Sequence, residues 1–99
     1  MSNKIYKIYT LSNVNKPEEI RYIGITKMSL KGRLSCHVCL AKTEPYNHRT
    51  NWVNKNKNKI LIQEIDSSND LKKCLELEMH YIKLFKSFGA KLINSTNGG

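Results

Sequence analysis

The sequence predicts a small α/β (α+β) domain in which a central three-stranded, mostly antiparallel sheet is flanked by helices, in the order β-β-α-α-β-α. Two observations carry this prediction. Two short stretches rich in isoleucine and tyrosine are separated by turn-forming residues, and two longer segments carry apolar residues at helical spacing. A chain of 99 residues is long enough for one modest core, so we expect one domain over residues 1–99.

Residues 4–12 and 19–26 are predicted to form a β-hairpin. Both favour strands, and the turn formers Asn13 to Pro17 lie between them. Gly24 interrupts the second strand, which indicates a bulge or a close approach by another backbone or a ligand, although a tolerated irregularity explains it equally well. Tyr6 and Tyr9 are expected to point to opposite faces of the sheet.

The first helix is predicted from Leu30 to Lys42, with Ser29 as its N-cap. Its core-facing stripe consists of Leu30, Leu34, Val38 and Ala41. Arg33 and His37 fall on the same stripe, one turn apart, where apolar residues are expected. An arginine at such a position either extends to water or meets an anion.

A second, short helix is expected from His48 or Arg49 to Lys55, with Trp52 as its core anchor. From Asn54 to Lys59 amide and ammonium side chains alternate, which predicts a solvated loop able to contact phosphates. Residues 60–65 are apolar enough for a third strand, which we place in the centre of the sheet.

The last helix is predicted from Asp70 to Ser87, with Ser67 or Ser68 as its N-cap and Gly89 at its C′ position. One apolar stripe comprises Leu71, Cys74, Leu75, Met79, Ile82 and Phe85, and it includes Glu78. Burying an unpaired carboxylate costs several kcal/mol, so Glu78 needs a cation, a metal ion or water. Arg33 would supply a purely structural ion pair, and a hard divalent cation is the functional alternative.

Composition favours a polyanionic partner inside the cell. The net charge is +9, from 17 basic and 8 acidic residues, which predicts attraction to nucleic acid. We expect no membrane association, because no apolar run approaches the ~20 residues of a membrane span, and no secretory signal is visible. Three cysteines, an odd number, favour reduced thiols and a cytoplasmic location. Cys36 and Cys39 form a C-x-x-C, but a zinc site needs four ligands.

Taken together, these residues resemble the GIY-YIG nuclease family, most closely its phage-type members. Lys7-Ile8-Tyr9 resembles the first motif, with lysine in place of glycine, and Tyr22-Ile23-Gly24 matches the second. The family's arginine, histidine, glutamate and closing asparagine correspond to Arg33, His37, Glu78 and Asn94, and His48 resembles a second histidine of phage-type members. An alternative register uses Lys4-Ile5-Tyr6, but it lengthens the hairpin by three residues, so Tyr9 is preferred.

The resemblance implies a metal-dependent endonuclease that hydrolyses phosphodiester bonds of double-stranded DNA. Glu78 would hold a single Mg²⁺ or Mn²⁺, Arg33 would stabilise the developing charge, and Tyr9 would be the general base. Tyr22 and His37 would position the water or relay its proton. The expected supporting residues are Gly24, His48 and Asn94, and the expected DNA contacts are Lys31, Arg49, Lys55, Lys57 and Lys59.

No small-molecule cofactor other than the metal is expected, and the phage-type pattern is compatible with a phage or viral origin. Two other classes remain open. One is a nucleic-acid-binding module that has kept the fold and lost catalysis. The other is a basic structural protein in which Arg33, His37 and Glu78 form a buried ion-pair network.

Overall fold

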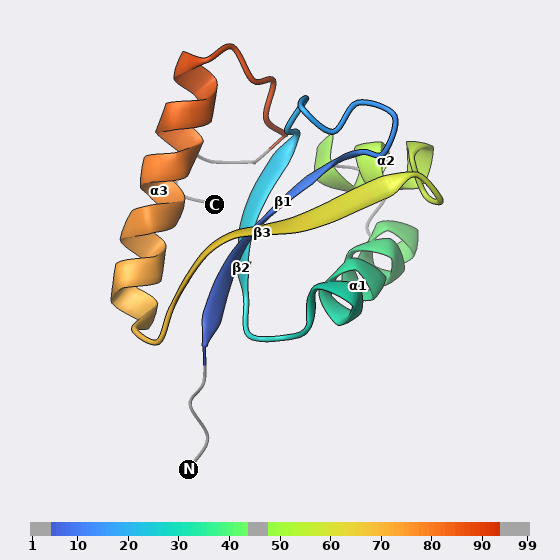
Figure 1. Ribbon diagram of the computed structural model, residues 1–99. Coiled ribbons are helices and arrows are strands. Elements are labelled where there is room, and N and C mark those ends of the chain that lie inside the picture. Colours follow the sequence, from blue (N-terminus) through green and yellow to red (C-terminus); the bar gives the residue numbers. More distant parts are fainter. Residues whose placement is uncertain (1–4, 44–47, 94–99) are drawn as a thin grey trace.

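The computed structural model describes residues 5–43 and 48–93 (Figure 1). Within these ranges the elements follow the predicted order β-β-α-α-β-α. They are β1 (Tyr6–Asn13), β2 (Tyr22–Thr26), α1 (Leu30–Thr43), α2 (His48–Lys55), β3 (Ile60–Ser68) and α3 (Leu71–Ser87). The predicted α+β class is confirmed.

The sheet is fully antiparallel and has the strand order β2-β1-β3. The prediction that the third strand occupies the centre is therefore wrong. β1 is the central strand, and its residues from Ile8 to Ser12 are buried even where they are polar. β3 is an edge strand that exposes Gln63 and Glu64. Because Thr10 and Ser12 make β1 look half-exposed in the sequence, while β3 begins with three apolar residues, the pattern favours the wrong strand.

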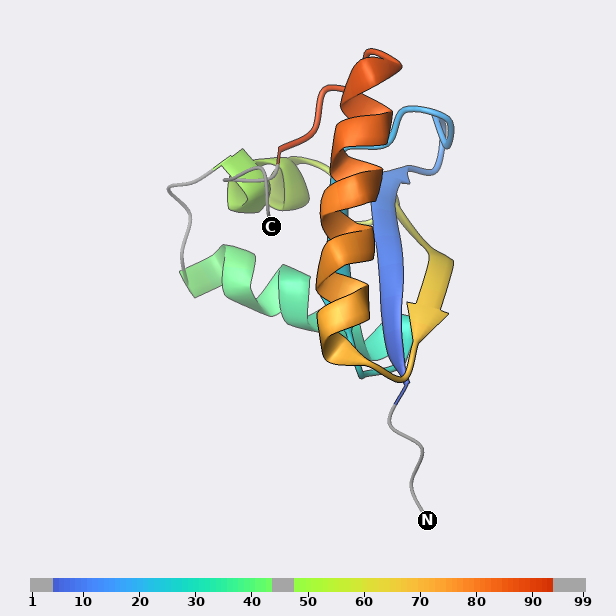
Figure 2. The same cartoon turned by 90° about the vertical axis from the view of Figure 1, so that its left-hand side faces the viewer.

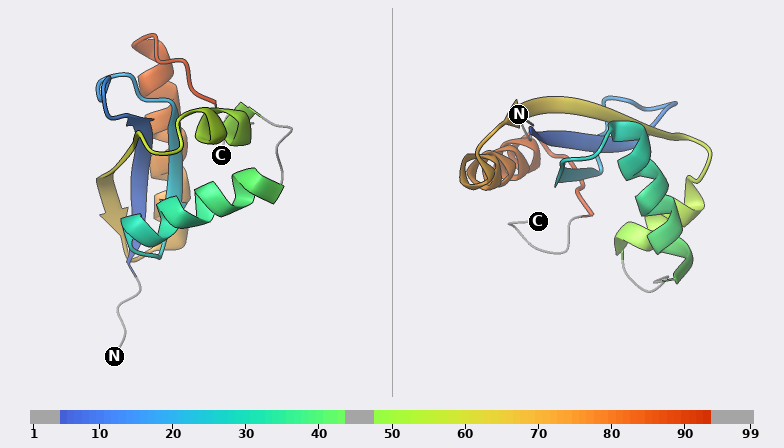
Figure 3. Two further views of the ribbon diagram at one scale, coloured as in Figure 1. Left: turned by 90° about the vertical axis from the view of Figure 1, so that its right-hand side faces the viewer. Right: turned by 90° about the horizontal axis from the view of Figure 1, so that it is seen from below.

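The fold has three layers, with α3 on one face of the sheet and α1 and α2 on the other (Figures 1 and 3). On the α3 side, Ile8 and Ile23 pack with Cys74 and Ile82. On the other side a second core cluster contains Tyr9, Leu11, Tyr22, Ala41, Val53, Ile60 and Ile93. Trp52 packs half-buried against this second cluster, as predicted. The central strand therefore contributes side chains to both cores.

Several element boundaries differ from the prediction. β2 begins at Tyr22 rather than at residue 19, and β3 continues to Ser68. The N-cap of α3 is consequently Asp70, whose side chain accepts a hydrogen bond from the Lys72 amide at 3.0 Å, and neither Ser67 nor Ser68 has this role. At the other end of α3, Gly89 has a φ of +89° directly after the cap residue, as its predicted C′ position requires.

α3 lies in front of the sheet in Figure 2, and the row of residues that it buries is narrower than the predicted stripe. Its buried residues are Cys74, Glu78 and Ile82, which are four positions apart. Leu71, Leu75 and Met79 belong to the predicted stripe, but each is more than 40% exposed. Glu78 therefore occupies the middle of the buried row. No helix within the described ranges has the length and apolar character that crossing a membrane requires.

Candidate active site

Four polar or aromatic side chains meet on the sheet face that α1 and α2 cover. Tyr9 comes from β1, Tyr22 from β2, and Arg33 and His37 from consecutive turns of α1. Ser29 caps α1, and its hydroxyl accepts a hydrogen bond from the Gly32 amide at 3.1 Å, as predicted. The apolar stripe of α1 packs on the core and turns Arg33 and His37 toward the strands. We call these four residues the tyrosine–histidine–arginine cluster.

Tyr9 is at the centre of this cluster. Its side chain is fully buried, and its hydroxyl forms a hydrogen bond with His37 Nε2 at 2.6 Å. Arg33 Nε donates to the same hydroxyl oxygen at 3.1 Å. Because the oxygen accepts from Arg33, its own proton can be donated to His37, which requires His37 to carry its proton on Nδ1. A directed chain from Arg33 through Tyr9 to His37 results.

Burial and the neighbouring cations set the protonation states of this chain. Burial raises the pKa of Tyr9 above its usual value, the nearby Tyr22 adds to this effect, and Arg33 and Arg49 oppose it. Burial lowers the pKa of His37 to about 4, and Arg33 and Arg49 lower it further in the same direction. At neutral pH Tyr9 is therefore a phenol and His37 a neutral imidazole, a matched donor and acceptor.

Gly24 is required by the packing around Tyr9. It is paired with Tyr9 across the sheet, and a Cβ atom at this position would lie 2.5 Å from the Tyr9 hydroxyl oxygen and 2.9 Å from Tyr22 Cε2. The sequence suggested a bulge or a close approach by another backbone or a ligand, whereas two tyrosine side chains make the close approach. The rings of Tyr9 and Tyr22 lie 5.8 Å and 5.3 Å from the His37 ring, in edge-on geometry.

The two candidate tyrosines of the first motif lie on different sides of the sheet. Tyr9 belongs to the core cluster beneath α1 and α2, whereas Tyr6 packs against the cluster beneath α3. The expectation that they face opposite ways is confirmed. Of these two tyrosines, only Tyr9 forms hydrogen bonds with Arg33 and His37.

Glu78 belongs to α3, on the opposite face of the sheet, and does not bond to this cluster. It is 6% exposed, and burial raises the pKa of its carboxyl to about 7. Among the described residues no side chain forms a salt bridge or hydrogen bond with it, so the structural ion pair with Arg33 is not formed. Its helix, α3, contacts β2, the edge strand that carries Tyr22 and Gly24.

A single carboxylate of this kind suits Mg²⁺ or Mn²⁺. Residues 5–43 and 48–93 contain no group of three or more His, Cys, Asp or Glu residues arranged to hold a metal ion. Mg²⁺ does not need such a group, because it keeps several waters and is commonly held by one or two carboxylates together with substrate phosphates. A buried carboxylate without a protein partner fits that requirement. The three cysteines, including the C-x-x-C pair, are free thiols.

The remaining predicted site residues are distributed over the surface and the chain ends. Lys31, Lys55, Lys57 and Lys59 are exposed. Arg49 is half-buried, and its charge acts on both Tyr9 and His37. From the sequence Arg49 was expected only to contact DNA, and its effect on Tyr9 and His37 could not be predicted, because no helical stripe links α2 to α1. The His48 side chain and Asn94 lie outside the described residues.

Two cavities lie at another part of the molecule, around the β1–β2 turn. The larger has a volume of about 530 Å³ and the smaller about 390 Å³. Neither is lined by any member of the tyrosine–histidine–arginine cluster.

Fold and cluster together define a basic α+β domain with a buried tyrosine–histidine–arginine centre. A protein-family model described as the GIY-YIG catalytic domain matches residues 5–94, so the chain belongs to the GIY-YIG family. Members of this family are usually nucleases and generally depend on divalent metal ions, which supports a nuclease with a nucleic-acid substrate. No curated protein and no solved structure matches the chain.

Proposed function

We propose that this protein is a metal-dependent endonuclease that hydrolyses phosphodiester bonds in double-stranded DNA. The observation that carries the proposal is the hydrogen-bonded chain from Arg33 through Tyr9 to His37. A packed core has no need of an arginine, a phenol and an imidazole in series. The net charge of +9 supports a polyanionic substrate.

In this mechanism Tyr9 relays a proton from the attacking water to His37 and does not have to ionise beforehand. Its pKa is raised, so the phenol does not ionise on its own at neutral pH. When the attacking water loses its proton to the Tyr9 oxygen, the phenolic proton passes to His37 Nε2, 2.6 Å away. His37 is neutral and can accept it. Tyr22 packs edge-on against the imidazole and fixes its orientation.

Arg33 has two tasks in the proposed reaction. Through Nε it holds the Tyr9 hydroxyl, and the two terminal nitrogens of its guanidinium group remain to bind phosphate oxygens. Charge that develops on the phosphate in the transition state would be stabilised by this fork geometry. Arg49 adds positive potential, and Gly24 provides the space for Tyr9.

Glu78 is the proposed ligand of a single Mg²⁺ or Mn²⁺. Such an ion supplies charge neutralisation at the phosphate and at the leaving oxygen. Glu78 offers it a buried carboxylate that forms no salt bridge with any residue of 5–43 or 48–93. We assign supporting roles to His48 and Asn94 by family resemblance. Exposed Lys31, Lys55, Lys57 and Lys59 are proposed to contact the DNA backbone.

Residues 1–99 are proposed to form a single catalytic domain of phage type that works inside the cell. Three free thiols, one of them fully buried, support a reducing compartment. The second candidate function is a DNA-binding module without catalysis on the same fold. The intact hydrogen-bonded chain favours the enzyme, because a module that only binds DNA has no use for it.

Nicking of supercoiled plasmid DNA in Mg²⁺ tests the proposal. We expect Arg33→Ala and Glu78→Ala each to slow nicking by at least about 100-fold, since each removes stabilisation of transition-state charge. Glu76→Ala is the matched control, because Glu76 is an exposed glutamate on the same helix and its loss is expected to leave the rate unchanged. Nicking by both site variants at the wild-type rate would contradict the proposal that the protein is an endonuclease. Salt-sensitive binding without cleavage by the wild type would establish the binding module instead.

A further inference from the structure

The smaller cavity is a groove between the end of β1 and the end of α2. Its volume of about 390 Å³ falls within the range of about 300–1,000 Å³ that is usual for sites of small organic groups. Its lining includes Asn13, Asn15, Arg21, Trp52, Lys55 and Asn56. None of these residues has a role in the hydrolysis described above, apart from Lys55 as a backbone contact.

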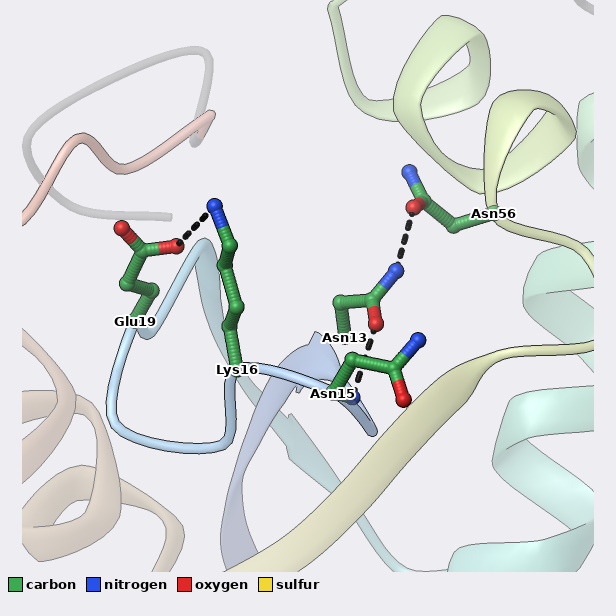
Figure 4. A network of polar contacts seen from close by, with 5 residues as sticks. All are labelled: Asn13, Asn15, Lys16, Glu19 and Asn56. Atoms are coloured by element: carbon green, nitrogen blue, oxygen red, sulfur yellow. Dashed lines mark hydrogen bonds and ion pairs between the residues drawn. The ribbon is translucent and has the colours of Figure 1, made fainter.

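Three hydrogen bonds make the floor of the groove rigid, and Figure 4 shows the two that involve the Asn13 side chain. Asn13 Nδ2 donates to Asn56 Oδ1 at 2.8 Å, and Asn13 Oδ1 accepts from the Asn15 backbone amide at 2.8 Å. Asn56 Nδ2 in turn donates to the Trp52 carbonyl at 2.8 Å. The amides of Asn13 and Asn56 are therefore fixed, and they tie the β1–β2 turn to the end of α2. The groove exists before any ligand binds.

Several polar groups at the groove lack a protein partner within the described ranges. The Asn15 side-chain amide forms no hydrogen bond there, and Lys55 forms no salt bridge. Arg21 Nε is buried without a hydrogen-bond partner. The one acidic lining residue, Glu19, pairs with Lys16 at 3.8 Å (Figure 4). The groove therefore presents two unpaired cations and one free amide.

One lining residue of the groove, Trp52, is aromatic, and this restricts the kinds of ligand that the groove can bind. Trp52 packs half-buried against the core beneath α2, so its position is held. An aromatic face stacks on nucleobases, a free amide can pair with the hydrogen-bonding edge of a base, and Arg and Lys bind phosphate. These three features together match a nucleotide whose base is not paired or stacked in a duplex.

We propose that this groove binds one unpaired nucleotide of the nucleic-acid substrate. The base stacks on Trp52, the Asn15 amide contacts its edge, and Lys55 and Arg21 bind the adjoining phosphate. This inference rests on the proposed function and adds a substrate class to it. Asn13 lies four residues along β1 from Tyr9, or about 13 Å of strand.

The fluorescence of Trp52 gives a direct test, because it is the only tryptophan in the chain. In EDTA, to prevent cleavage, a single-stranded 12-mer is expected to quench the emission to saturation, and a blunt duplex of the same sequence is expected not to. Asn15→Ala and Lys55→Ala should weaken single-strand binding by about three- to tenfold. Loss of one phosphate contact in Lys55→Ala should also reduce the slope of log K against log salt by about 0.7.

Lys83→Ala is the matched control, since Lys83 is an exposed lysine on α3, away from the groove. The groove assignment is overturned if Lys55→Ala and Lys83→Ala bind alike, or if duplex and single strand quench equally. Plasmid nicking by the same preparations separates the two hypotheses. Nicking without quenching removes only the groove assignment, and absence of both nicking and binding removes the nuclease as well.

Discussion

At the residue scale, the burial of Glu78 serves its proposed role as a metal ligand but lowers the stability of the fold. Its carboxylate is 6% exposed and has no partner in the part of the chain that the structure describes, and such a group destabilises the folded chain whenever it is charged. Active sites commonly carry such groups, because the interaction that compensates them arrives with the metal or the substrate. Helical spacing identified Glu78 from the sequence, since a glutamate within an apolar row is conspicuous.

The stability of the metal-free protein should therefore depend on pH. The pKa of Glu78 is raised from 4.5 to about 7, so between these values the folded state binds more protons than the unfolded state, and stability falls as pH rises through 7. His37, whose pKa falls from 6.5 to about 4, has the opposite effect, which ends only when the unfolded histidine is fully deprotonated, above pH 7. From pH 6.5 to 8 we expect the free energy of unfolding to fall by about 0.4 kcal/mol, because Glu78 lowers it by about 0.8 and His37 raises it by about 0.4 kcal/mol.

Urea denaturation in EDTA at the two pH values measures this change. Glu78→Gln should replace the fall with a rise of about 0.4 kcal/mol, because the amide does not titrate and only the His37 effect remains, and Glu76→Gln should retain the fall. A wild-type stability that stays constant from pH 6.5 to 8, or a fall that persists in Glu78→Gln, would show that Glu78 is not buried as described.

At the scale of the elements, β2 is shaped by the tyrosines it accommodates. Gly24 allows the Tyr9 hydroxyl to approach the strand backbone, and any side chain there meets the ring. From the sequence Gly24 was ambiguous between a bulge, a close approach and an irregularity. Periodicity describes one element at a time, and the close approach here arises between two strands.

Gly24→Ala should therefore disrupt the site. A Cβ atom 2.5 Å from the Tyr9 hydroxyl oxygen cannot be accommodated without moving a fully buried ring, so we expect a stability loss of about 1–3 kcal/mol and a loss of nicking activity. Gly32→Ala is the control: its Cβ would meet only Ser29 and Met28 side chains near the exposed start of α1, where alanine favours the helix. Thermal unfolding and nicking of both variants measure the difference, and equal behaviour would contradict the packing role of Gly24.

At the scale of the whole molecule, local patterns predicted the elements and long-range packing decided their arrangement. The cap at Ser29, the α1 stripe and the Gly89 stop follow from short-range chemistry and are correctly predicted. Strand order was mispredicted, because burial of Thr10 and Ser12 depends on helices that are distant in sequence. The Asp70 cap was missed for a related reason, since β3 runs further than its apolar residues indicate.

The same distinction applies to the site. Arg33, His37 and Glu78 stand out because each violates an apolar pattern, and the family resemblance supplied Tyr9 and Tyr22. The action of Arg49 on the cluster and the asparagine-floored groove depend on α2 meeting α1 and the β1–β2 turn, which no local pattern encodes. Sheet geometry separates Tyr9 from Tyr6 and assigns them to opposite layers.

The most direct test of the account compares two removals of a single hydroxyl. Tyr9→Phe deletes the oxygen that links Arg33 to His37, while Tyr6→Phe makes the same change on the opposite face of the sheet. In a plasmid-nicking assay with Mg²⁺, we predict that Tyr9→Phe lowers the rate at least about 100-fold, as expected for loss of general acid–base catalysis, and that Tyr6→Phe leaves it unchanged. Equal rates for the two variants, or a loss confined to Tyr6→Phe, would contradict the proposed catalytic role of the Tyr9 hydroxyl.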